Sequence, residues 1–134
     1  MSHYRKCLLN HFFFRVWVKT MDDAVFVKKG EQKSEVRKLG KLYRLMVKSD
    51  QMEAIIAEID PYSESRWFQH DGEELHLVLR GEMEYTVGEK SYKLSEGDVL
   101  WHRSNLKHRA KNNSNKKVMY ITIGTPPTLG WDML

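Results

Sequence analysis

Short segments in which apolar and polar residues alternate recur along most of the chain. Successive side chains of a β-strand point to opposite faces, so this period of two predicts strands with one buried face. Polar or glycine-containing turns at residues 87–90, 95–98 and 112–115 separate several of these segments. Short strands about 8–12 residues apart, with turns between them, are typical of an all-β sandwich or barrel. We expect strands at residues 42–48, 52–59, 75–79, 83–87, 91–94, 99–102, 108–111 and 117–123.

Two segments give a weaker pattern. Residues 52–59 (MEAIIAEI) contain good helix formers, but the segment is short and Pro61 follows it, which favours a strand. Residues 24–28 alternate only weakly. We therefore expect the folded domain to span residues 24–134, with its barrel ending near Pro127.

Residues 1–23 look unlike the rest and are interpreted as an N-terminal extension. Residues 12–18 are rich in β-formers, which suggests an extra edge strand that packs on the barrel or on a partner. The alternative is a mis-called start, with Met21 as the natural initiator. The sequence leaves both interpretations open.

Composition narrows the class of protein. With 134 residues, 41% of them hydrophobic and 30% charged, the chain suits one folded domain. No run of about 18 apolar residues occurs, so a membrane-spanning helix is not expected. The single cysteine, Cys7, excludes an intramolecular disulfide and a multi-cysteine zinc site, and a cytoplasmic location is the simplest interpretation.

The net charge of +4 is spread unevenly: residues 1–50 carry a balance of +7 and residues 51–134 a balance of −3. A basic segment can contact nucleic acid or an acidic partner. Here the basic residues alternate with Glu31, Glu35 and apolar positions, and no helix-turn-helix or aromatic RNA-binding pattern accompanies them. This pattern favours a solvated surface over a nucleic-acid site.

Candidate metal ligands flank the most regular stretch of strands. His70 and Glu74 stand at its start, and His108 stands 34 residues after Glu74. Two imidazoles and one carboxylate suit first-row divalent metals, either as the facial triad of non-haem iron proteins or as a catalytic zinc site. Alternation places Glu74 and His76 on one face, and Phe68 and His70 likewise. Spacing alone does not exclude histidines that are only surface or hydrogen-bonded residues.

Further spacings extend this pattern. Gly81 follows Glu74 by seven residues, His108 follows Gly97 by eleven, and Asn112 follows His108 by four. These positions match the two motifs of the cupin family, which the chain resembles over roughly residues 24–127. The phrases HDGEELHLVLRGEMEY, YKLSEGDV and TPPT are most similar to cupin domains that follow a helix-turn-helix in bacterial and archaeal regulators. The DNA-binding part is missing from this sequence.

The resemblance implies a double-stranded β-helix, or jelly-roll barrel, with a divalent metal ion (Fe, Mn, Ni or Zn) in its mouth. His70, Glu74 and His108 would be the metal ligands. Phe68 stands where cupins usually have a histidine as a fourth ligand. In some cupins a three-ligand site of this kind still works, and in others the loss of a ligand goes with loss of the metal and a purely binding role. Such barrels commonly pair, and exposed strand edges favour pairing, so we expect a homodimer.

The expected pocket is lined by Phe68, His76, Tyr85 and His102. His76 takes a place that is usually apolar or aromatic in cupins, and it is the candidate catalytic group, with a buried structural histidine as the alternative. One hypothesis is a metal-binding cupin with a small-molecule pocket in the barrel mouth, which would be a mononuclear metal enzyme if it turns over a substrate. The other is a non-catalytic ligand-sensing domain. A structural or storage role is less favoured for so short a chain.

Overall fold

The computed structural model describes residues 3–9, 14–20, 23–129 and 134. Every strand pairing in this part is antiparallel. No helix there has the length and apolar character needed to cross a bilayer. The strands are β1 (His3–Leu9), β2 (Phe14–Thr20), β3 (Ser34–Lys38), β4 (Lys41–Lys48), β5 (Glu53–Ile59), β6 (Glu73–Arg80), β7 (Glu82–Val87), β8 (Lys90–Ser95), β9 (Val99–Arg103), β10 (His108–Lys111) and β11 (Val118–Thr125).

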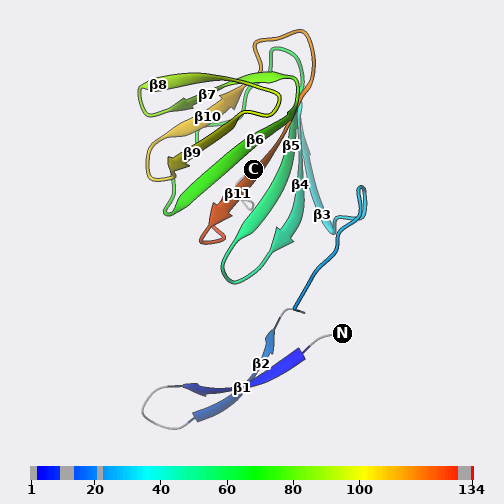
Figure 1. Ribbon diagram of the computed structural model, residues 1–134, viewed down its shortest axis with the longest axis vertical. Helices are drawn as coiled ribbons and strands as arrows, with labels where there is room; N and C mark the ends of the chain where they lie inside the picture. Colours follow the sequence, from blue (N-terminus) through cyan, green and yellow to red (C-terminus); the bar gives the residue numbers. More distant parts are fainter. Residues whose placement is uncertain (1–2, 10–13, 21–22, 130–133) are drawn as a thin grey trace.

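Two sheets form the barrel. One has six strands in the order β3-β4-β5-β11-β6-β9, and the other has three in the order β10-β7-β8. They face each other across the interior, with the longer sheet curving around the shorter one (Figure 1). The all-β jelly-roll predicted from the sequence is therefore confirmed, and the eight expected strands occur with bounds shifted by at most two residues.

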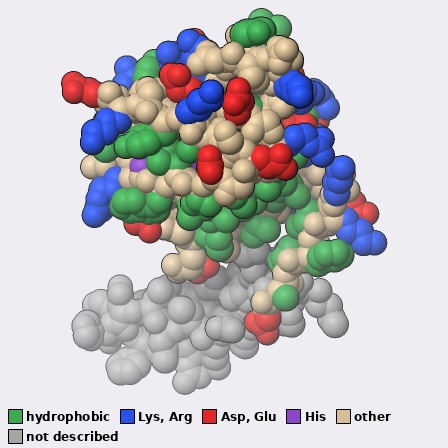
Figure 2. Space-filling view, turned by 45° about the horizontal axis from the view of Figure 1, so that its top comes forward, with side chains coloured by type: hydrophobic (Ala, Val, Ile, Leu, Met, Phe, Trp, Pro, Cys, Tyr) green, Lys and Arg blue, Asp and Glu red, His purple; other side chains and the backbone are tan. Residues whose placement is uncertain are grey.

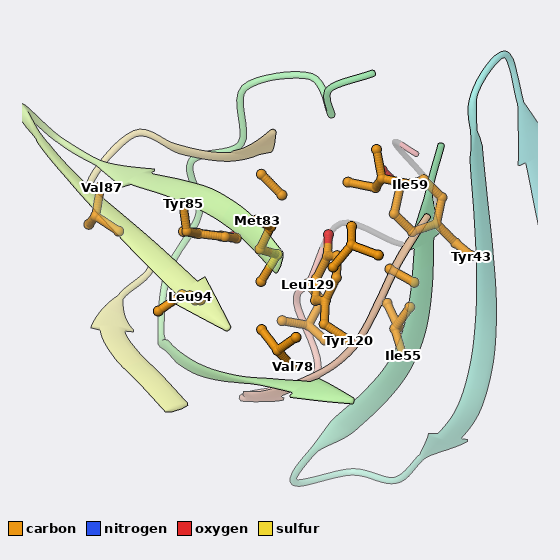
Figure 3. Close-up of a cluster of buried hydrophobic side chains, with 13 residues drawn as sticks. Tyr43, Ile55, Ile59, Val78, Met83, Tyr85, Val87, Leu94, Tyr120 and Leu129 are labelled. Atoms are coloured by element: carbon orange, nitrogen blue, oxygen red, sulfur yellow. The ribbon is translucent and has the colours of Figure 1, made fainter. Parts of the chain in front are cut away.

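Apolar side chains from both sheets fill one part of the interior. Ile59 and Val78 come from the six-stranded sheet, Met83 comes from the facing sheet, and none of them is more than 2% exposed. Figure 3 shows these side chains directed toward one another, with the rings of Tyr43 and Tyr120 beside them. Alternation along each strand supplies this core, because every second residue faces inward.

The middle of β6 departs from the usual alternation of apolar inside and polar outside. Its buried residues include Glu74 and His76, whereas Leu75 and Leu77 lie on the other, half-buried face. The sequence predicted this division of faces. A buried carboxylate beside a buried imidazole requires specific partners, because an unpaired polar group in the interior is costly.

Two glycines fix the ends of β6. Gly72 and Gly81 have φ angles of +100° and +82°, which favour glycine. A Cβ atom on Gly81 would lie 2.8 Å from the carbonyl oxygen of Lys117. The chain can therefore turn sharply on both sides of the strand that carries Glu74.

The N-terminal strands form a sheet of their own, in which β1 pairs with β2. The expected strand at residues 12–18 overlaps β2, although residues 12 and 13 lie outside the described residues. The sequence did not predict β1 or β3, and residues 24–28 are in no strand. The division into an extension and a barrel domain at residue 23 stays a prediction.

Both signs of charge are mixed on the part of the barrel surface seen in Figure 2. Lys and Arg side chains lie among Asp and Glu side chains, with apolar groups between them. Among the ion pairs of the barrel, Arg44 Nη1 lies 2.9 Å from Glu58 Oε2. This view of the barrel therefore shows a mixed surface and no continuous basic patch.

Candidate metal centre

Four structural elements bring the candidate ligands into the barrel. Glu74 and His76 lie on the inward face of β6, and His102 lies directly opposite Glu74 in the pairing of β6 with β9. His108 begins β10. His70 precedes β6 in a loop, and its backbone N–H donates to the Ser104 carbonyl at 3.0 Å. Residues far apart in sequence therefore share one site because of strand register.

Glu74 is the centre of this cluster and is only 4% exposed. Its Oε2 lies 3.1 Å from Nε2 of His70 and 3.1 Å from Nε2 of His108. Its Oε1 lies 3.5 Å from Nε2 of His76 and 3.9 Å from Nε2 of His102. The Ser104 hydroxyl donates to Oε2 at 2.7 Å. Each carboxylate oxygen thus faces its own pair of imidazoles.

In three of these histidines, the Nδ1 atom on the far side of the ring from Glu74 contacts a backbone carbonyl oxygen. A backbone carbonyl can only accept a hydrogen bond, so it fixes a proton on the Nδ1 atom that contacts it. A neutral ring then presents the lone pair of Nε2 toward Glu74. The carbonyl contacts are His70 Nδ1 with Asp71 at 3.2 Å, His102 Nδ1 with Arg103 at 2.9 Å and His108 Nδ1 with Leu106 at 2.6 Å.

His76 is held differently. Its Nδ1 lies 2.8 Å from the Thr122 hydroxyl oxygen, and its Nε2 lies 2.9 Å from Nε2 of His102. The Tyr85 ring packs against His76, with ring centroids 4.1 Å apart. A hydroxyl can donate or accept, so Thr122 suits either tautomer of His76.

The surroundings favour the ionised form of Glu74 and the neutral forms of His76 and His102. Burial would raise the pKa of Glu74, but its contacts with His108 and His70 and the charge of His76 hold that pKa well below its ordinary value. Burial lowers the pKa of His76 to about 3, and burial also lowers the pKa of His102. For His70, burial acts to lower the pKa, but contacts with Glu74 and Asp71 leave it raised. Metal binding needs ionised carboxylates and neutral imidazoles, and Glu74, His76 and His102 are held in those forms.

The geometry of the predicted ligand set fits a divalent ion. The ligand atoms of His70, Glu74 and His108 all lie within 4.8 Å of one another. The Nε2 atom of His70 is buried and makes no hydrogen bond, although Glu74 Oε2 is 3.1 Å away. A lone pair facing a carboxylate oxygen is repulsive unless a proton or metal ion lies between them. Nitrogen and oxygen donors of this kind suit iron, manganese, nickel and zinc.

The remaining predicted pocket residues surround the same cluster. Tyr85 is buried, and its ring centroid lies 5.5 Å from that of His102. Phe68 is half-buried, with its ring 6.1 Å from the His108 ring. The structure thus brings all the candidate residues together, and their roles as ligands or catalytic groups stay predictions.

Sequence reasoning missed two partners of the cluster. Ser104 and Thr122 are buried polar residues that contact Glu74 and His76. Alternation along β11 would have placed Thr122 on the inward face with Val118 and Tyr120. Ser104 lies in a turn after β9, where no periodic pattern gives the direction of a side chain.

Comparison with known families and sequences supports the motif analysis. A family model described as a cupin domain matches residues 55–124, which is just over half of the chain. An "uncharacterized protein" of Archaeoglobus fulgidus is 31% identical over 64 residues, which cover 48% of this chain and 60% of the relative. The chain thus spans about 60% of the length of that curated relative.

Solved structures share the fold at low identity. KdgF from Halomonas sp. has a TM-score of 0.69 at 18% identity, covering 83% of this chain and 100% of that one. An RmlC-like cupin from Shewanella frigidimarina has a TM-score of 0.67 at 18% identity, covering 81% and 95%. The cupin domain of an XRE-family transcriptional regulator from Enterobacter cloacae has a TM-score of 0.61 at 15% identity, covering 66% and 98%. At these identities the likeness concerns the fold alone.

Proposed function

Because this chain belongs to the cupin domain family, we propose that it holds a divalent metal ion through His70, Glu74 and His108 and binds a small molecule beside it. The observation that carries this proposal is the convergence of two imidazole Nε2 atoms on one buried carboxylate oxygen, each at 3.1 Å. When bound, such an ion supplies a Lewis acid that polarises an oxygen ligand. The donor set suits Fe(II), Mn(II), Ni(II) or Zn(II).

The surrounding residues would orient the ligands. Ser104 holds the Glu74 carboxylate through its hydroxyl, and the Leu106 carbonyl holds the proton of His108 on Nδ1. Contacts of this kind fix the direction of a ligand and typically change metal affinity or activity by about 10–100-fold. They therefore support a prearranged site.

Access supports a small-molecule partner. The His70 side chain is 17% exposed, whereas those of His76 and His108 are 1% exposed. The cluster is therefore least buried at His70, and a small molecule would approach it from that side. Phe68 adds an apolar ring next to His108. This arrangement suits a ligand that has one polar end for the ion and one apolar part.

A non-catalytic sensing domain is the second candidate. Phe68 is the observation in its favour, because it places an apolar ring where a further ligand would otherwise stand. The similar fold of the Enterobacter cloacae regulator domain adds support. A metal-loaded protein that is thermally stabilised by a small metabolite, yet turns over no compound in a dioxygenase, isomerase and epimerase screen, would favour sensing over catalysis.

Equilibrium dialysis against each of the four metals, followed by metal analysis, tests the proposed ligand set. The His70→Ala/His108→Ala variant should lose the ion. The Gln69→Ala/Lys107→Ala variant is the matched control, because both of its side chains are exposed neighbours of the ligands. Equal metal content in the two variants would contradict the proposal.

A further inference from the structure

We propose that Glu74, His76 and His102 form a second metal position, so that the Glu74 carboxylate bridges two divalent ions. This inference rests on the proposed function, because the bridge adds an ion to the carboxylate of the first site. It gives His76 a role as a metal ligand in place of the catalytic role expected from the sequence.

The two oxygens of Glu74 carry the first part of the argument. Oε2 faces His70 and His108, and Oε1 faces His76 and His102. The ligand atoms of Glu74, His76 and His102 lie within 4.8 Å of one another, and this set shares only Glu74 with the first set. Each set of histidines faces a different oxygen of Glu74. Two separate metal positions therefore account for this arrangement better than a single ion does. Two-metal sites hold their ions about 3.5–4 Å apart in this way.

The spacing of the imidazoles carries the second part. Nε2 of His76 and Nε2 of His102 are 2.9 Å apart. At a metal–nitrogen distance of about 2.0–2.1 Å, two nitrogens in neighbouring coordination positions lie roughly 3 Å from each other. The nitrogens are therefore already spaced as ligands of one ion.

The outer contacts allow an ion to replace the proton between these nitrogens. Without metal, neutral His76 donates from Nε2 to His102 and accepts at Nδ1 from the Thr122 hydroxyl. With metal, the His76 proton moves to Nδ1 and the same hydroxyl accepts it. His102 keeps its Nδ1 proton on the Arg103 carbonyl in both states. The contact between His76 and Thr122 is therefore kept in both states, with the direction of the hydrogen bond reversed.

Charge sets the order of binding. One carboxylate is shared by two dications, so the second ion meets the repulsion of the first in a poorly solvated site. All three residues of the second set are buried, whereas His70 of the first set is partly exposed. We therefore expect the first position to fill before the second.

Titration with Co(II) and with Zn(II), with bound metal counted after dialysis, tests the bridge. All proteins carry His3→Ala and His11→Ala, so that the N-terminal histidines add nothing to the count. The parent should bind two ions in two steps, and His102→Gln and His76→Gln should each bind one. Urea unfolding of the parent and of both variants shows whether each protein is folded. If a variant does not fold, the number of ions bound by the parent is the test.

The outcomes separate this inference from the proposed function. A parent that binds one ion, lost in His70→Ala/His108→Ala and kept in His102→Gln, overturns the bridge and leaves the proposed function intact. One ion that is kept in His70→Ala/His108→Ala and lost in His102→Gln overturns both. Two ions kept in His102→Gln and His76→Gln also overturn the bridge.

Discussion

At the scale of single residues, Asn112 shows how one buried amide can hold several segments. Its side chain is fully buried, and its Nδ2 donates to the carbonyls of Ile59 at 3.0 Å and Lys116 at 2.8 Å. Its Oδ1 accepts from the backbone N–H of Ser114 at 3.0 Å and from the hydroxyl of that residue at 2.7 Å. The amide thus joins the end of β5 to the turn before β11.

Asn112→Ala should lower the free energy of unfolding by about 1–3 kcal/mol, because it removes the buried hydrogen bond to the Ile59 carbonyl and the contacts that hold the turn at Ser114. Urea unfolding followed by circular dichroism measures the change. Asn113→Ala is the control, since that exposed side chain makes a single contact with Glu84 at 3.3 Å. Equal losses in the two variants would contradict the structural role of Asn112.

Phe68→His should tighten metal binding. Phe68 and His108 form an isolated β-bridge in which each backbone N–H donates to the other residue. Directly opposite residues of such a pair lie on the same face, so an imidazole at position 68 would stand beside the ion. We expect a gain on the order of tenfold, or ~1.4 kcal/mol. Titration calorimetry measures it, and Phe68→Leu, which adds no ligand, should leave affinity unchanged.

Local pattern predicted some of the site residues and not others. The period of two along β6 correctly put Glu74 and His76 on one face. It could not show that His102 lies opposite Glu74, because that pairing depends on the register between β6 and β9. The separation of the four histidines into two sets depends on where individual side-chain atoms lie, which no local pattern contains.

At the scale of elements, the strands differ in how strongly the sequence marks them. β7 alternates regularly and was predicted within one residue of its bounds. β3 (SEVRK) was missed because its charged residues indicate surface, and it forms the edge of the sheet beside β4. Edge strands bury less, so their sequences carry a weaker apolar pattern.

A pair of valines tests whether the inward face of β11 stabilises the barrel. Val118 of β11 is 0% exposed, and Val25, which lies outside the strands, is 50% exposed. Val118→Ala should cost about 1.5–3 kcal/mol through lost burial and a residual cavity. Val25→Ala should change stability by less than about 0.5 kcal/mol. Urea midpoints for the two variants measure the difference, and similar midpoints would show that Val118 is not a core residue.

At the scale of the whole molecule, the outer face of the six-stranded sheet carries a row of apolar residues, the outer stripe. Strand pairing places Leu77 next to Ile121 and Val99, and Leu75 next to Ile123 and Trp101. Trp101 and Val99 are 50% and 54% exposed. Contiguous exposed apolar surface of this kind marks interaction sites, and a second copy of the chain would cover it by symmetry.

We therefore expect a homodimer that buries the outer stripe. Light scattering should give about twice the 15.9 kDa mass of one chain. Trp101→Lys should shift the protein to the monomer, because it places a charge in the apolar contact. Tyr92→Lys, on the other sheet, should stay dimeric. A wild-type mass of one chain at micromolar concentration would contradict this expectation.

The place of β11 in the barrel has a consequence for synthesis on the ribosome. β11 is the last strand among the residues that the structure describes, yet it lies between β5 and β6 in the six-stranded sheet. Until residue 125 has left the exit tunnel, the nascent chain exposes unpaired edges on both earlier strands. Pairing between distant segments is slow, and open edges invite association with other chains. The newly made chain is therefore most exposed to aggregation in the interval before β11 takes its place between β5 and β6.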